Sequence, residues 1–189
     1  GRFGSEMCII DSDEGILTET NVEILSSLRT VFSEDGQVTA GNASQVSDGA
    51  SAILIASEEK AKSEGWPILA RIVEYATSGV ESNRVMSAPI PTVKKLLKIT
   101  GMRLDDVDIL EHNEAFASAS CAIRDSLGIP DESFNPHGGA IAIGHPLGAT
   151  GARCLMTLVN AMRRRGSRRG IVTVCLGGGN AVAMMVECP

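Results

Sequence analysis

The feature that most constrains the fold is an alternation of short apolar runs with glycine-terminated helical segments, which begins at residue 50. The apolar runs have the length and composition of strands, and they cover residues 50–56, 70–77, 107–111, 170–176 and 181–187. Helices are predicted over residues 57–64, 92–100, 115–127 and 148–165. Phe134 and Asn135 are expected in one further short strand. Because strands alternate with helices until two strands follow each other at the end, the pattern predicts an α/β layered domain, βαβαβαββ, with a mixed sheet covered by helices.

The first 47 residues have a different pattern. Thr20 and Glu23 form a capping box, and apolar residues at helical spacing predict an amphipathic helix that runs to about Ser33. Residues 36–49 are small, polar and interrupted by glycine, so they predict a loop whose backbone a ligand can approach closely.

The composition argues against several kinds of partner. The chain has 17 basic and 23 acidic residues and few aromatic ones, so we expect no nucleic-acid surface. The local basic run at residues 163–169 is typical of a solvated helix end, with a phosphate-bearing ligand as the alternative. No segment reaches the roughly 18 to 20 apolar residues of a membrane helix, so no membrane partner is expected. Five cysteines without a C-x-x-C pair favour free thiols in a reducing compartment over a metal site.

Three clusters of reactive residues directly follow predicted strands, where open α/β sheets bind ligands. The first cluster, residues 111–117, contains Asn113 and Glu114. Its simplest interpretation is a helix cap, with Asn113 as the N-cap and Glu114 in the first turn.

The second cluster, residues 137–151, surrounds His145 with glycines and a proline. It lacks the Lys-Ser/Thr pair of a phosphate loop and the G-x-G-x-x-G spacing of a dinucleotide site. The glycines are expected to hold His145 in a fixed backbone setting, which favours acid/base work over a purely structural role.

The third cluster places Cys175 at the end of a strand, before Gly177, Gly178 and Gly179. This arrangement suits a reactive thiol of low pKa beside backbone N–H groups that bind an oxyanion. The alternative is a buried apolar cysteine in a tight hairpin. Cys8, Cys121, Cys154 and Cys188 lack such surroundings and are expected to be inert.

Together these clusters resemble the thiolases. The stretches at residues 113–116, 138–146 and 175–179 are similar to three signature blocks of that family, in the same order and at fitting spacing. Residues 39–44 with Asp48 and Gly49 are similar to a fourth. The resemblance implies the thiolase fold.

The resemblance also implies roles for individual residues in a Claisen condensation or its thiolytic reverse. His145 would activate a nucleophile and line an oxyanion hole, and Asn113 would hold a water there. Cys175 would be the acid/base for the α-proton, and Gly177 would offer its N–H to the acyl-enzyme oxyanion. Residues along the coenzyme A thioester would be Ser44, Ala40, Ala115 and Phe116.

The resemblance covers the second half of a thiolase. Residues 1–47 would be the end of the coenzyme A-binding loop domain, residues 48–67 the last strand and helix of the N-terminal domain, and residues 68–189 the C-terminal domain. No residue matches the family's nucleophilic cysteine. We therefore expect a partner, an N-terminal half that carries this cysteine, and dimers or tetramers of the two-chain unit. Acetyl-CoA or another acyl-CoA would be the substrate, without a cofactor. Cytoplasm is the expected location, since any organelle leader would belong to the other half.

Two alternatives remain open. A related decarboxylating condensing enzyme would typically have two histidines, or His and Asn, without a second catalytic cysteine, so Cys175 favours thiolase. A half-chain with only a structural or regulatory role would be expected to lose Asn113, His145 and Cys175, all of which are present.

Overall fold

The computed structural model describes residues 19–189, so Cys8 and the start of the 1–47 segment lie outside it. At its centre is a sheet in the order β1 (Arg71–Gly79), β4 (Asn180–Glu187), β3 (Arg169–Leu176) and β2 (Ile109–His112). β2 and β3 are parallel, whereas β4 is antiparallel to both of its neighbours. The prediction of a mixed sheet is confirmed.

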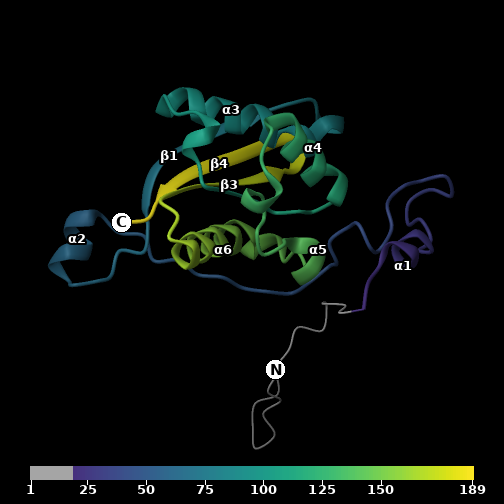
Figure 1. Cartoon of the computed structure of the whole chain (residues 1–189), viewed down its shortest axis with the longest axis horizontal. Coiled ribbons are helices and arrows are strands. Elements are labelled where there is room, and N and C mark those ends of the chain that lie inside the picture. The colour runs from purple at the N-terminus through teal and green to yellow at the C-terminus, as the bar shows by residue number, and fades with distance from the viewer. Residues whose placement is uncertain (1–18) are drawn as a thin grey trace, which may run out of the picture.

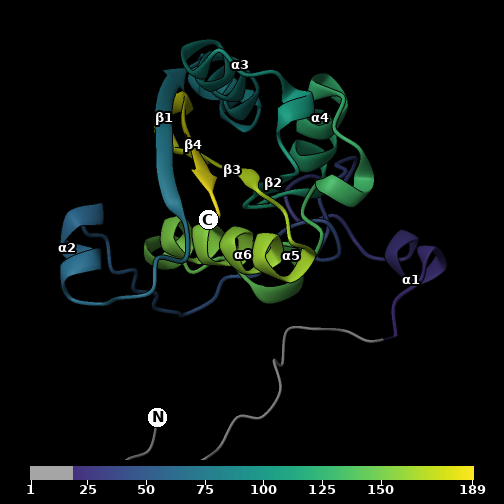
Figure 2. The ribbon, with the colours of Figure 1, turned by 60° about the vertical axis from the view of Figure 1, so that its left-hand side comes forward.

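Helices cover both faces of this sheet (Figures 1 and 2). α3 (Pro89–Thr100) packs on one face with α4 (Ala117–Leu127) beside it, and α6 (Thr150–Arg165) covers the opposite face. Leu96 on α3 and Leu158 on α6 are fully buried in the two resulting cores. Strands with a parallel neighbour need apolar cover on both faces, and here they have it. No helix in residues 19–189 is long and apolar enough to cross a bilayer.

The predicted helix ends depend on capping residues that the structure shows in place. α2 (Glu58–Ser63) begins after Ser57, whose side chain accepts a hydrogen bond from the Lys60 N–H. α3 and α4 end at Gly101 and Gly128, whose φ angles of +68° and +70° lie in the left-handed region. A short helix not predicted from the sequence, α5 (Ala140–Ile143), precedes α6.

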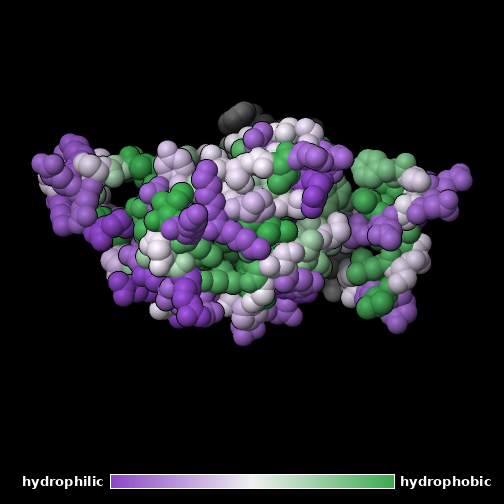
Figure 3. All heavy atoms as spheres, turned by 90° about the horizontal axis from the view of Figure 1, so that it is seen from above, coloured by the Kyte–Doolittle hydropathy of each residue, from purple (hydrophilic) through white to green (hydrophobic). Residues whose placement is uncertain are grey.

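The helix predicted from Thr20 to Ser33 is much shorter in the structure. α1 covers only Val22–Ser26, and its N-cap is Asn21, whose side chain accepts from the Ile24 N–H. The chain then turns back, since the Val31 N–H donates to the Val38 carbonyl. Short helices are stabilised mainly by packing, and α1 has no buried residue. It lies at one projecting end of the molecule (Figures 1 and 3), where apolar side chains reach the surface.

The strand predicted at residues 50–56 is wrong for the chain as described. This segment passes along α6 between α1 and α2 without joining the sheet (Figure 1). Leu54 is 76% exposed and Ile55 is 66% exposed. β1 and β2 are the edge strands of the described sheet, but this segment pairs with neither of them. The strand predicted at Phe134 is likewise reduced to a single bridge with Leu110.

The core beneath α6 gives a test of the fold. Leu158→Ala should lower the free energy of unfolding by about 2–5 kcal/mol, because it opens a cavity between α6 and the sheet. Ile99→Ala on α3, where the side chain is 51% exposed, should cost less than about 1 kcal/mol. Urea unfolding followed by circular dichroism measures both, and equal losses would contradict the placement of α6.

Candidate functional site

The parallel pairing of β2 with β3 brings two of the predicted clusters to one edge of the sheet. His112 on β2 pairs with Thr173 on β3. Asn113 and Cys175 therefore leave the sheet at the same edge, where parallel strands present their carboxyl ends. No hydrogen bond joins Cys175 to Asn113 or to His145 among residues 19–189.

Asn113 and His145 are in direct contact. The Asn113 Nδ2 atom lies 3.2 Å from His145 Nε2, although the residues are far apart in the chain. Asn113 is buried, and its backbone carbonyl accepts from the Ala140 N–H at 2.9 Å. The prediction that Asn113 is a helix cap is wrong, because α4 begins at Ala117 with Phe116 as its N-cap. Its side chain is instead free to contact the histidine.

Hydrogen bonds define the form of the His145 ring. The Thr150 hydroxyl donates to the Pro146 carbonyl at 3.0 Å, so it accepts from the His145 Nδ1–H at 2.7 Å. The lone pair of Nε2 then faces the NH₂ group of Asn113. Burial, with a smaller effect of the Arg153 charge, lowers the pKa of His145 below its ordinary 6.5. His145 is therefore neutral at pH 7, with Nε2 as the acceptor.

Two glycines shape the loop around His145, and a larger residue at either position would displace neighbouring atoms. A Cβ on Gly139 would lie 2.5 Å from the Glu114 Cβ, and the Gly139 N–H donates to Glu114 Oε2 at 2.9 Å. Gly144 has a φ of +89°, and a Cβ there would meet the Ser47 hydroxyl. These contacts hold the segment before His145 against two other loops, as the glycine pattern predicted.

Three of the four residues predicted to bind coenzyme A lie together. The Ser44 N–H donates to the Ala115 carbonyl at 2.9 Å, and Phe116 forms a bridge with Ala43. Ala115 is buried, whereas Ser44 and Phe116 are half-buried. Ala40 is exposed and takes no part in these contacts.

Cys175 is half-buried at the end of β3, with its Sγ 3.9 Å from Met86 Sδ. Burial raises the pKa of its thiol, so the expectation of a low pKa is wrong for this chain. Gly177 is exposed with open space around it, whereas Gly179 packs so closely on Val80 that a Cβ would lie 2.3 Å from the Val80 carbonyl oxygen. The close packing of Gly179 therefore fixes the turn between β3 and β4, while Gly177 in the same turn stays accessible to solvent.

Two further ionisable residues lie behind this pair: Glu111, which belongs to the first predicted cluster, and Arg153, which was not predicted. Arg153 Nη2 donates to Asn113 Oδ1 at 2.5 Å, and Nη1 lies 3.9 Å from Oε1 of the fully buried Glu111. Burial raises the pKa of Glu111 to about 8. One signal pointed to Arg153, because it is the lone charge in residues 150–162 and lies near a helix N-terminus, where a cation is unfavourable.

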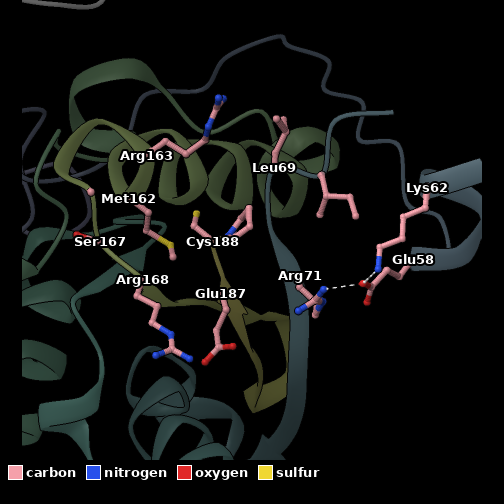
Figure 4. A pocket seen from close by; sticks show the side chains of 13 residues that line it. Glu58, Lys62, Leu69, Arg71, Met162, Arg163, Ser167, Arg168, Glu187 and Cys188 are labelled. Carbon is pink, nitrogen blue, oxygen red and sulfur yellow. Dashed lines mark ion pairs between the residues drawn. The ribbon is translucent and has the colours of Figure 1, made fainter. Parts of the chain in front are cut away.

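A large cavity in the described part of the chain lies elsewhere. It measures about 930 Å³ and lies between α2, the end of α6 and the end of β4 (Figure 4). Arg71 and Lys62 both form ion pairs with Glu58 beside it. None of the predicted site residues lines it. Within residues 19–189, no three His, Cys, Asp or Glu side chains are grouped so as to hold a metal ion.

The buried Glu111 leads to a prediction on pH. Its pKa is about 8 when folded and 4.5 ordinarily, so the folded state holds an extra proton between these values. The contribution of Glu111 to the free energy of unfolding is then fully present below pH 4.5, and it is lost as the pH rises through 8. The free energy of unfolding of the wild type relative to Glu111→Gln should fall by roughly 2–5 kcal/mol from pH 5 to pH 9.

Urea unfolding across this pH range measures the difference. Buried His112, whose pKa is lowered to about 4, makes a contribution with the opposite pH dependence. Because the wild type and Glu111→Gln both contain His112, this contribution cancels in the difference between them. Glu132→Gln, at an exposed position, controls for the loss of one carboxylate. Parallel profiles for the wild type and Glu111→Gln would show that Glu111 is ionised in the fold.

Comparisons with known proteins agree with one another. The family model "Thiolase, C-terminal domain" matches residues 66–188, and "Thiolase, N-terminal domain" matches residues 2–59. The chain is 47% identical to an acetyl-CoA acetyltransferase of Shinella zoogloeoides over 99% of its own length and 47% of that protein's. It is 42% identical to a 3-ketoacyl-CoA thiolase of Bacillus subtilis, over 95% of its own length and 46% of that protein's.

Solved structures give the same picture. The Bacillus anthracis acetyl-CoA acetyltransferase superposes with a TM-score of 0.94 at 38% identity, over 100% of this chain and 48% of that one. Human mitochondrial 3-ketoacyl-CoA thiolase in complex with CoA gives 0.91 at 42% identity, over 95% and 46%. The chain thus spans about half the length of the curated relatives it matches. With a thiolase fold and matches to both family models, this chain belongs to the thiolase family.

Proposed function

We propose that the chain supplies the acid/base half of a thiolase active site. The assembled enzyme would catalyse the Claisen condensation of acyl-CoA thioesters or its thiolytic reverse, as an acetyl-CoA acetyltransferase or a 3-ketoacyl-CoA thiolase. The observation that carries this proposal is the Asn113–His145 contact beside the carboxyl ends of β2 and β3.

The neutral His145 suits two roles in this chemistry. Its Nε2 lone pair can accept the proton of an attacking thiol, and the resulting Nε2–H can donate to a developing oxyanion. Asn113 would hold a water in the same oxyanion hole with its NH₂ group. A lowered pKa keeps His145 in the base form at the start of the reaction.

Cys175 is proposed as the acid/base that removes the α-proton of the second thioester. Its raised pKa means that the thiol is protonated in the chain as described, which suits the return of a proton in the thiolytic direction. In the condensing direction the thiolate must form, and a neighbouring donor or substrate that lowers the pKa would have to come from the assembled site. Gly177, exposed beside it, would offer its N–H to the acyl-enzyme oxyanion.

The thioester would lie along the loop that pairs with the start of α4. Ser44, Ala115 and Phe116 meet there, and Ala40 lies further along the same loop. The solved human mitochondrial thiolase with CoA is similar to this chain over 95% of the chain's length. No cofactor is needed in this proposal, because the thioester itself provides the activated acyl group and the acidic α-proton.

The nucleophilic cysteine is proposed to come from an N-terminal half on a second polypeptide. Two observations support a partner of this kind. The chain spans about half the length of its relatives, and the apolar side chains of residues 53–55 lie exposed beside a groove that includes Trp66 and Ile72. The two-chain unit is proposed to form dimers or tetramers. A purely structural role is less well supported, because the Asn113–His145 pair is intact.

Assembly is tested by adding the missing half. The 189-residue chain alone should not cleave acetoacetyl-CoA, because it lacks the nucleophile. Co-expression with the first half of the Shinella zoogloeoides relative, which the chain does not match, should give a complex that cleaves it. The same half with its nucleophilic cysteine replaced by Ala is the matched control. Full activity of the chain by itself would refute the proposal.

The two catalytic residues should differ in which step they affect. In the assembled enzyme, His145→Ala should lower both thiolysis and condensation by at least about 10²-fold, because it removes a base and an oxyanion donor. Cys175→Ser should abolish condensation yet leave acylation measurable, since only the α-proton step needs that thiol. Rapid-quench detection of the acyl-enzyme separates the two steps.

His137→Ala is the control for these variants, since His137 is exposed in the same loop. His112 is unsuitable as a control, because it is fully buried and contacts the Ser120 hydroxyl, so its loss would disturb the fold. A Cys175→Ser enzyme that condenses acetyl-CoA at the wild-type rate would remove Cys175 from the mechanism.

A further inference from the structure

The orientation of the Asn113 carboxamide is decided by a residue outside the signature stretches. A carboxamide has an acceptor oxygen at one end and a donor NH₂ group at the other, with nearly the same shape. In the structure the NH₂ end faces His145 Nε2 at 3.2 Å, and Oδ1 accepts from Arg153 Nη2 at 2.5 Å. Because guanidinium donates only, Arg153 is compatible with the oxygen end alone.

Arg153 reaches Asn113 from the first turn of α6. Thr150, which accepts from His145 Nδ1, lies three residues earlier on the same helix. Residues three apart lie on one helical face. A single turn of α6 therefore contacts both members of the pair, each on the side away from the Asn113–His145 contact.

We propose that Arg153 is a positioning residue, whose guanidinium holds the Asn113 carboxamide with its NH₂ group toward His145 Nε2. The importance of this orientation for the reaction rests on the proposed thiolase function. With Arg153 in place, Asn113 is a donor to the neutral histidine. If the carboxamide were reversed, Oδ1 would face the Nε2 lone pair, and the NH₂ group could no longer hold a water in the oxyanion hole.

The surroundings of Arg153 suit such a role. Its side chain is 13% exposed, and the same Nη2 lies 3.4 Å from the Asn113 backbone carbonyl. On the other side, Nη1 lies 3.9 Å from Oε1 of the buried Glu111. The Cys154 thiol, 3.9 Å from Oδ1, is a weaker second donor. A guanidinium group holds its donors in a fixed plane, so Arg153 can donate to both the side chain and the backbone carbonyl of Asn113.

A double-mutant cycle in the assembled enzyme separates positioning from a structural effect. Arg153→Met should lower kcat by about 10- to 100-fold, with KM changed by less than about threefold, because geometry and not substrate binding is lost. In an Asn113→Ala background, Arg153→Met should cost less than about twofold more. Arg153→Lys, which keeps one donor, should recover part of the rate. Arg163→Met, on the exposed face of α6, is the matched control.

The proposal would be overturned if the kcat losses of Arg153→Met and Asn113→Ala multiplied in the double variant, or if Arg153→Met left kcat unchanged. A second measurement needs no turnover. With only this chain labelled at histidine, nitrogen NMR of the assembled complex should show His145 protonated at Nδ1. Arg153→Met should shift its Nε2 resonance and raise its pKa, and Arg163→Met should not. An unchanged His145 spectrum in Arg153→Met would also overturn the proposal. An inactive wild-type complex would count against the thiolase function, while the spectra still decide the role of Arg153.

Discussion

The parallel pairing of β2 with β3 is the interaction on which the candidate site depends. It brings the chain at Asn113 and the chain at Cys175 to the same edge, although the two residues are far apart in sequence. The pairing is possible because α6 covers one face closely. Gly170, the β3 partner of Ile109, has no room for a Cβ, which would lie 2.6 Å from Met162 and 2.7 Å from Leu158 on that helix. The same close approach brings the first turn of α6 against the loops that follow the sheet.

Burial determines the charge state of the groups around Asn113. It lowers the pKa of His145 and raises the pKa of Glu111, so that both are largely neutral at pH 7. The Arg153 guanidinium is then the cation of this largely buried region, with a donor directed at the carboxamide oxygen. Such an arrangement polarises Asn113 before any substrate arrives, and a fixed dipole beside a developing oxyanion costs no reorganisation when the negative charge forms. The arrangement is consistent with chemistry that passes through anionic intermediates.

Features that depend on residues close in sequence could be predicted from the sequence, whereas features that depend on contacts between distant segments could not. Helix ends at Gly101 and Gly128 could be predicted because a left-handed residue acts on its own turn. The segment at residues 50–56 has the composition of a strand, but it pairs with no strand of the described sheet, and composition does not specify a pairing partner. The residues around Asn113 alone suggested a helix cap, because its contact with His145 exists only after the sheet and α6 have assembled, and only the family resemblance indicated a shared site for the two residues. Arg153 was missed for the same reason, since its partner is on a different element. The roles predicted for His145, Cys175 and Gly177 remain predictions.

The position of β4 has a consequence for how the molecule is made. β4 is the last strand in sequence order, yet it lies between β1 and β3, and Arg71 on β1 pairs with Glu187 near its end. On a ribosome, β1 must therefore wait through the synthesis of α3, β2, α4 and α6 before its neighbour emerges. Contacts between distant parts of a chain form slowly, and the nascent sheet would remain open during that time. Of the four strands, β1 therefore emerges first and waits longest for its hydrogen-bonding partner.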